Sequence, residues 1–150
     1  MAETIYVYQG ETFMLNVSFA SDQEQLVILN SVRGGNLKYI DSDEHPNGDN
    51  YQITNANTTP LIFELFSYYK NARSGREPWR PHSAIIENKW DILRRRYYKT
   101  LRGNDGGNDQ DYNDTILSLL WLNYNQRTRS EHIKQMGKAK NSKKPKVLKK

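Results

Sequence analysis

The residues whose types and spacing most clearly suggest a binding site lie in one short acidic segment. Its eleven positions hold four aspartates and three asparagines, namely Asn104, Asp105, Asn108, Asp109, Asp111, Asn113 and Asp114. Carboxylates this close repel one another, so each ionised group makes the next harder to ionise. A hard divalent cation removes that penalty, and a donor set of oxygens without His or Cys favours Ca²⁺ over zinc or copper. Gly106 and Gly107 allow the tight backbone turn that brings such ligands together.

One other interpretation of this segment stays open, and one is excluded. An Asn/Asp-rich turn can cap its own backbone without any ion. An EF-hand begins with the same Asp109-x-Asp111-x-Asn113 spacing, but it needs glycine at the sixth position and glutamate at the twelfth. This sequence has Asp114 and Leu120 at those positions. The segment is therefore not an EF-hand, and the charge of its four aspartates would balance two Ca²⁺ ions.

The rest of the sequence predicts strands that would position this segment. Apolar and polar residues alternate over 12–19, and the run 115–122 is apolar on both faces, as in a central strand. For residues 85–101 the spacing suits a helix and a strand equally. Fifteen Asn, ten Tyr and only six Ala also favour strands joined by turns. Further strands are expected at 4–8, 26–29, 51–54 and 61–69, with loops at 41–50 and 71–82. The predicted fold is all-β, an antiparallel β-sandwich of about nine strands with a basic C-terminal extension.

Charge divides the 150-residue chain into two parts. Residues 127–150 hold ten Lys or Arg and one acid, whereas residues 1–126 hold 12 basic and 16 acidic residues. We therefore expect a folded domain over 1–126 and a basic, disordered tail over 127–150. The tail is either a solvated extension or an electrostatic contact for a polyanion such as nucleic acid or an anionic membrane surface.

Several classes of function lack their characteristic residues. The sequence has no cysteine, which excludes disulfides and thiolate zinc sites. The three histidines, His45, His82 and His132, stand far apart and are expected on the surface, and no common hydrolase or nucleotide-binding motif occurs, so we expect no enzyme. No apolar run approaches ~20 residues, which predicts no transmembrane segment. The N-terminus lacks a signal-peptide pattern, so synthesis is expected in the cytoplasm and release would need a non-classical export route.

One stretch of the sequence resembles a known family. The run Asp109-Gln110-Asp111-Tyr112-Asn113-Asp114, followed by an apolar strand with Trp121, resembles the calcium loop of the bacterial calcium-mediated fucose/mannose-binding lectins, the LecB-like family. The match extends upstream through Leu101-x-Gly103 and Gly107. It recurs near the N-terminus, where Phe19-Ala20 closes a strand and Ser21-Asp22-Gln23-Glu24 precedes another. The resemblance covers about residues 12–32 and 97–122.

This resemblance implies a calcium-dependent carbohydrate-binding protein. Its fold would be a nine-stranded sandwich, assembled as a homo-oligomer (a dimer or tetramer), with two Ca²⁺ ions per subunit. Two or three ring hydroxyls of a fucose- or mannose-type monosaccharide on a glycan would bind both ions directly. By position, the calcium ligands would be Asp105, Asp109, Asp111, Asn113, Asp114 and the carbonyl of Ser21. The sugar-binding residues would be Asp22, Gln23, Glu24, Gly106, Asp109, Asp111 and Asp114.

Three departures from the family pattern keep two alternatives open. Gly106 stands where the family has a sugar-binding carboxylate, and Asp105 is shorter than the usual glutamate. The family ends soon after the Trp-containing strand, with its terminal carboxylate in the partner's site, whereas this chain continues for 28 residues past Leu122. One alternative is a structural or assembly protein on a lectin-like scaffold without sugar binding. The other is polyanion binding through the basic tail.

Overall fold

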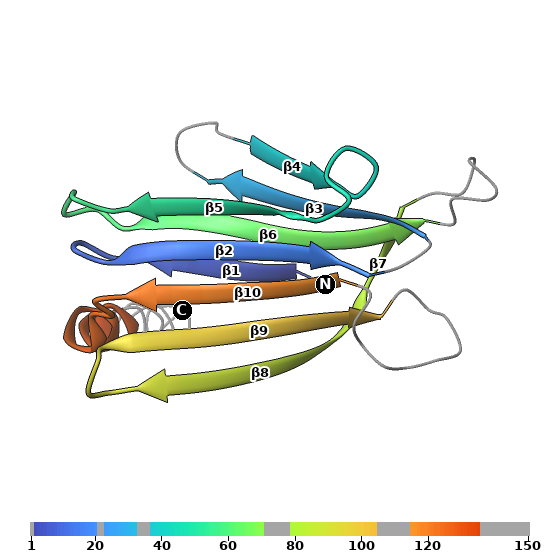
Figure 1. The fold of residues 1–150 in the computed structure, drawn as a ribbon. Helices are drawn as coiled ribbons and strands as arrows, with labels where there is room; N and C mark the ends of the chain where they lie inside the picture. Colours follow the sequence, from blue (N-terminus) through green and yellow to red (C-terminus); the bar gives the residue numbers. More distant parts are fainter. Residues whose placement is uncertain (1, 21–22, 33–36, 71–78, 105–114, 136–150) are drawn as a thin grey trace, which may run out of the picture.

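The computed structural model of the chain describes residues 2–20, 23–32, 37–70, 79–104 and 115–135. These residues form two antiparallel sheets that pack as a sandwich, which confirms the predicted fold (Figure 1). Sheet A contains, in spatial order, β1 (Ala2–Val7), β6 (Leu61–Lys70), β3 (Glu24–Ser31) and β4 (Leu37–Asp41), with the short β7 (Arg80–Pro81) paired to β6. Sheet B contains β5 (Asp49–Thr54), β2 (Thr12–Phe19), β10 (Thr115–Leu122), β9 (Arg96–Asn104) and β8 (Ser83–Asp91).

The core lies between the two sheets and is built from alternate residues of each strand. On β10 the buried apolar residues are Leu117, Leu119 and Trp121, and each lies opposite a buried residue of β2. Trp121 packs on Phe13 with ring centroids 5.1 Å apart, and its Nε1 donates a hydrogen bond to the carbonyl of Tyr6, 3.0 Å away in sheet A. Fully burying such side chains stabilises the fold by about 1.5–3 kcal/mol each. The apolar residues that alternate along 12–19 in the sequence are thus the residues of β2 that are buried in the core.

The ambiguous stretch 85–101 forms a hairpin of strands rather than a helix. β8 and β9 pair antiparallel along their length, and β9 also pairs with β10. Leu101 of β9 is fully buried, whereas β8 lies at the edge of sheet B and most of its residues are exposed. An edge strand with little contact to the core is not constrained to alternate. Its sequence therefore did not distinguish strand from helix.

β4 is a strand that the sequence did not predict. It pairs with β3 over Leu37–Asp41, and Ile40 is its one fully buried side chain. A five-residue edge strand with a single core residue leaves almost no periodic signal. The turn that follows ends at Gly48, which has φ +82°, and a Cβ there would lie 1.7 Å from the carbonyl oxygen of Val17. Only glycine can bring the turn this close to β2.

The C-terminal helix, residues 126–135, corrects the expected domain boundary at residue 126. Asn125 caps its N-terminus, because the side-chain Oδ1 accepts a hydrogen bond from the backbone N–H of Thr128 at 3.1 Å. The expectation of disorder from residue 127 onward is therefore wrong for 127–135. Residues 136–150 lie outside the described part of the chain, so polyanion binding by the basic tail stays a prediction. Within the described residues, no helix is long and apolar enough to cross a membrane.

Candidate functional site

One end of the sandwich gathers the flanks of the segments singled out in the sequence. Thr115, the first residue of β10, pairs with Phe19 at the end of β2 and with Gly103 near the end of β9. The chain therefore leaves β9 and enters β10 at the same end at which it passes from β2 to β3. This end, on the right in Figure 1, is called the loop end below.

Most of the predicted calcium and sugar residues lie outside the described part of the chain. Ser21 and Asp22 belong to one such segment, and Asp105, Gly106, Asp109, Asp111, Asn113 and Asp114 belong to the other, 105–114. The structure describes the residues on either side of both segments, and the strand register brings those flanks together. The individual calcium ligands stay predictions.

Gln23 and Glu24 are the two predicted sugar-binding residues that the structure describes. The carbonyl of Gln23 accepts a hydrogen bond from Nε2 of Gln25 at 3.0 Å. Glu24 begins β3, and its Oε2 lies 3.3 Å from Nζ of Lys70, with 14% of the side chain exposed. Burial raises the pKa of the Glu24 carboxyl, and a hydrogen bond with Asp41 raises it further. The carboxylate is thus engaged with sheet A, which does not favour the expected sugar contact.

Two further carboxylates lie beside Glu24. Ligand oxygens of Glu24, Asp41 and Asp43 all lie within 4.8 Å of one another. Asp41 ends β4, and its Oδ1 accepts the backbone N–H of Asp43 at 2.9 Å. Lys70 offsets part of this charge through its ion pair with Glu24. The group therefore adds negative potential to the loop end, which attracts cations.

A buried network of polar side chains, called the His82 cluster, lies beneath the loop end. It consists of Gln25, Ser67, His82 and Thr115, all at most 3% exposed. Because Nε2 of Gln25 donates to a carbonyl, Oε1 of Gln25 is the acceptor for the His82 ring Nε2 and for the Thr115 hydroxyl, the latter at 2.9 Å. The other ring nitrogen, Nδ1, lies 2.6 Å from Oγ of Ser67. The expectation of a surface histidine at position 82 is therefore wrong.

The His82 cluster joins the two sheets where the candidate segments begin and end. Gln25 and Ser67 belong to sheet A, whereas Thr115 is the first residue of β10 in sheet B. Gly103 packs so closely that a Cβ there would lie 3.0 Å from ring carbons of His82. A satisfied buried network of this kind specifies one packing arrangement. It therefore fixes the positions from which residues 105–114 leave and re-enter sheet B.

Sequence reasoning missed this cluster, although the period of the strands contained a signal. Ser67 continues the buried alternation of Phe63 and Leu65 on β6, and Thr115 continues that of Leu117 on β10. A small polar residue at an inward position of a strand must have a hydrogen-bond partner inside the protein. Extending the two-residue period would have placed both hydroxyls in the core, facing a third polar group.

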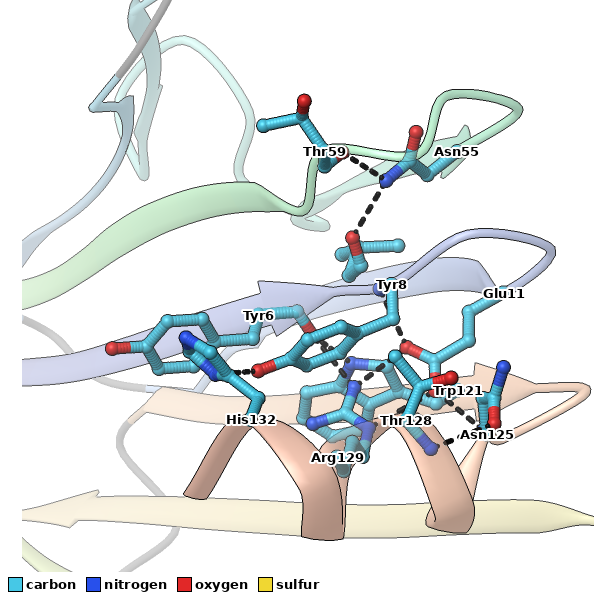
Figure 2. A network of polar contacts seen from close by, with 11 residues as sticks. Tyr6, Tyr8, Glu11, Asn55, Thr59, Trp121, Asn125, Thr128, Arg129 and His132 are labelled. Carbon is cyan, nitrogen blue, oxygen red and sulfur yellow. Dashed lines mark hydrogen bonds and ion pairs between the residues drawn. The ribbon is translucent and has the colours of Figure 1, made fainter. Parts of the chain in front are cut away.

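A charged network, called the Glu11 cluster, holds the helix at the opposite end of the sandwich (Figure 2). Glu11 is fully buried, and its carboxylate accepts hydrogen bonds from Nε and Nη2 of Arg129 at 3.0 and 2.7 Å. It also accepts the backbone N–H groups of Tyr8 and Asn125, at 2.8 and 2.6 Å. The guanidinium of Arg129 lies over the ring of Tyr124, 4.3 Å from the centroid, and donates to the carbonyl of Tyr6 at 2.6 Å.

Further polar contacts surround the Glu11 cluster. The guanidinium of Arg129 also lies 4.8 Å from the ring centroid of Tyr8. The hydroxyl of Tyr8 contacts Nδ1 of His132, so this histidine is also more than an isolated surface residue. Burial raises the pKa of the Tyr8 and Tyr124 phenols, which keeps both in the neutral form that packs against the guanidinium. These contacts anchor the helix and lie away from the loop end.

Comparison with known proteins identifies the fold. No protein-family model matches the sequence, and no curated protein sequence matches it. A Chromobacterium violaceum lectin solved with α-methyl-fucoside aligns with a TM-score of 0.53 and 16% identity, over 79% of this chain and 94% of that lectin. The chain has the fold of a bacterial lectin.

Two more solved structures agree with this assignment of the fold. The C-terminal domain of a Burkholderia cenocepacia lectin aligns with a TM-score of 0.54 and 14% identity, over 81% of this chain and 97% of that domain. A high-affinity mannose-binding lectin of Ralstonia solanacearum aligns with a TM-score of 0.51 and 13% identity, over 79% and 94%. Because each lectin is covered almost completely, the likeness extends over the whole sandwich. It confirms, at the level of the fold, the resemblance read from the sequence.

Proposed function

We propose that the protein binds carbohydrate through calcium at the loop end of the sandwich. The observation that carries this proposal is the pairing of Thr115 with both Phe19 and Gly103. It brings the flanks of the acidic segment 105–114 and of residues 21–22 to one place. The fold is shared with lectins, and the proposal requires no catalytic group.

The donor set of the acidic segment fits calcium. Carboxylate and amide oxygens, without nitrogen or sulfur donors, suit a hard cation that takes six to eight oxygen ligands. The negative potential of Glu24, Asp41 and Asp43 at the same end would favour its approach. Two ions per subunit would balance the four aspartates of the segment. The proposed ligands are Asp105, Asp109, Asp111, Asn113, Asp114 and the carbonyl of Ser21.

The proposed ligands are fucose- and mannose-type monosaccharides. This choice is supported by the lectins of the same fold, one solved with α-methyl-fucoside and another described as mannose-binding. Asp22 and Gly106 are the proposed positions that tune sugar preference, while Glu24 anchors the start of β3. Vicinal ring hydroxyls suit this role because they can replace calcium-bound water and donate to neighbouring carboxylates. Several such sites in an oligomer would raise the avidity for a glycan surface.

Titration calorimetry of the full chain tests this function directly. Methyl fucoside and methyl mannoside are titrated in calcium and again in EDTA, and heat is expected only in calcium. The full chain is required, because cutting at residue 126 would remove Arg129 and leave the buried carboxylate of Glu11 without its cation. A folded protein that gives no heat in either buffer would contradict sugar binding and favour a scaffold used for structure or assembly.

Thermal melting separates calcium binding from sugar binding. Asp111→Ala and Asp114→Ala should lower the melting temperature in calcium and leave it nearly unchanged in EDTA, because a bound ion stabilises only the fold that binds it. Asp91→Ala, at the far end of β8, is the control and should behave alike in both buffers. Equal losses in both buffers for Asp111→Ala would rule out the calcium assignment.

A further inference from the structure

The edge strand β8 gives the sandwich a long exposed side. β8 pairs with β9 over Ser83–Asp91, and no other described strand pairs with it (Figure 1). Three of its apolar side chains, Ile85, Ile86 and Trp90, are 44%, 49% and 37% exposed. Unpaired backbone N–H and C=O groups along such an edge form a template for another strand. No Pro or bulge interrupts this edge.

The pairing with β9 assigns each β8 side chain to a face of sheet B. Opposite residues in antiparallel strands share a face, and Ile86 lies opposite the buried Leu101. Ile86, Asn88 and Trp90 therefore share the inner face, and the intervening Glu87 and Lys89 share the outer face. Ile86 is nevertheless half exposed, because sheet A ends at β1 within the described residues and leaves β8 uncovered. The ion pair between Glu3 of β1 and Lys99 shows that β1 lies over β9.

We propose that β8 pairs antiparallel with β8 of a second copy of this chain, with Asn88 on the two-fold axis. In this register Glu87 lies opposite Lys89 of the partner subunit, and Ile86 lies opposite Trp90 of the partner subunit. Symmetry repeats each pair, so the outer face gains two opposite-charge pairs and the inner face two apolar pairs. The two five-stranded sheets B then form one continuous sheet across the dimer.

Neighbouring registers lack this complementarity. An axis at Glu87 places two carboxylates opposite each other, and an axis at Lys89 places two ammonium groups opposite each other. Like charges directly opposite destabilise strand pairing. An axis between two residues would oppose an inner-face side chain with an outer-face one, which a pleated sheet does not allow. The Glu87 carboxylate is 59% exposed while it contacts Arg102 at 3.2 Å, so it remains accessible to a lysine of the partner subunit.

The absence of cysteine from the sequence makes a cross-linking test direct. Asn88→Cys places one thiol opposite the other across the axis, within the separation that a disulfide spans. Glu87→Cys and Lys89→Cys are matched controls, because their thiols would face residues 89 and 87 rather than each other. Under mild oxidation, the full chain with Asn88→Cys should form a disulfide dimer at least about tenfold faster than either control. Equal rates, or a faster control, would overturn the register.

Charge exchange tests the same register without a covalent bond. By sedimentation equilibrium, Lys89→Glu and Glu87→Lys should each raise the dissociation constant of the dimer at least about tenfold. The double variant should restore it, and a mixture of the two single variants should form a heterodimer tighter than either homodimer. Thermal melting checks that each variant is folded.

Two outcomes of the charge exchange would overturn the proposal. One is a native chain that stays monomeric at millimolar concentration, and the other is a double variant as weak as the single ones. No sugar or calcium is needed in either experiment, so their result is independent of the proposed function.

Discussion

The two ends of the sandwich bury polar side chains in different ways. The Glu11 cluster is built on one ion pair, in which a fully buried carboxylate accepts from Arg129 and from two backbone N–H groups. The His82 cluster is built from a histidine and three uncharged polar side chains that hydrogen-bond one another across the two sheets. The eight residues of β10, roughly 25 Å, separate the two ends. Each cluster can therefore be perturbed without direct contact to the other.

The difference reflects what each end holds in place. The helix 126–135 buries little apolar surface, and Ile133 is 67% exposed, so a charged pair provides its attachment. The loop end carries Glu24, Asp41 and Asp43, and the four aspartates of 105–114 stand in the sequence between β9 and β10. A buried charge beneath them would act strongly on their ionisation, because the interior screens poorly. The His82 cluster supports the loop end without a buried carboxylate, lysine or arginine.

Arg129→Ala should have the largest effect on stability. It leaves the Glu11 carboxylate buried without a cation, which costs about 3–5 kcal/mol of unfolding free energy. Urea unfolding measures this loss. Arg127→Ala is the matched control on the same helix, since its ion pair with Glu131 involves a side chain that is 90% exposed and should contribute almost nothing. Similar losses in the two variants would mean that the buried pair does not anchor the helix.

His82→Ala should have the next largest effect, at the loop end. It removes a partner from both Gln25 and Ser67 and leaves a cavity, for a loss of about 2–3 kcal/mol. Calcium-dependent sugar heat should weaken in this variant, whereas Arg129→Ala, measured where it is folded, should retain it. If Arg129→Ala weakens the sugar heat and His82→Ala does not, the His82 cluster does not support the sugar site.

Gly103→Ala should reduce stability by a smaller amount, about 1–2 kcal/mol. The added methyl would lie 3.0 Å from the His82 ring, which must shift and lengthen its hydrogen bonds. In the double variant with His82→Ala, the methyl occupies space that the ring has left. The double variant should therefore lose less than the sum of the two single losses. Strict additivity would show that the methyl acts through the β9 backbone instead.

Glu24→Gln should have the smallest effect. Burial, and then Asp41, raises the pKa of Glu24, so the folded chain holds this proton more tightly than the unfolded chain. The associated stability is present below the ordinary glutamate pKa and is lost as pH rises through the raised pKa.

Melting temperatures across pH measure this contribution. Glutamine cannot ionise, so the variant does not lose stability as pH rises through the raised pKa of Glu24. Its melting temperature relative to that of the native chain should therefore be higher at pH 7 than at pH 3.5. The Lys70 ion pair keeps the difference small. A difference that falls with rising pH would show that the ion pair outweighs burial and Asp41.

Much of the fold could be predicted because strands that pack on the core show a regular alternation of apolar residues in the sequence. β2 and β10 contribute alternate side chains to the core from sheet B, and their apolar residues fall where the two-residue period requires. β8 and the helix were harder, because neither depends on a stripe of buried apolar residues. The attachment of the helix rests on Arg129, which looks like one more basic residue in a basic tail until Glu11 is placed beside it.

The candidate site was predictable in its residue types and only partly in its surroundings. The acidic segment stands out by composition, and the strand register places its flanks at the same end as those of residues 21–22. The strand period places the Ser67 and Thr115 hydroxyls in the core, but their hydrogen-bond partners could not be read from local sequence. The members of the His82 cluster come from β3, β6, β10 and the link between β7 and β8. Hydrogen bonds between residues so distant in sequence depend on the packing of the two sheets.

The place of β10 in the chain has a consequence for how the protein is made. β10 is the central strand of sheet B, yet it is the last strand within the described residues, and it pairs Leu122 with Thr12 and Thr115 with Phe19. Contacts this distant form slowly, and during synthesis they cannot form before Leu122 has left the ribosome. Until then β2 and β9 each present an open edge to other nascent chains. Translation that stalls before residue 115 should therefore yield aggregation-prone fragments rather than a smaller folded domain.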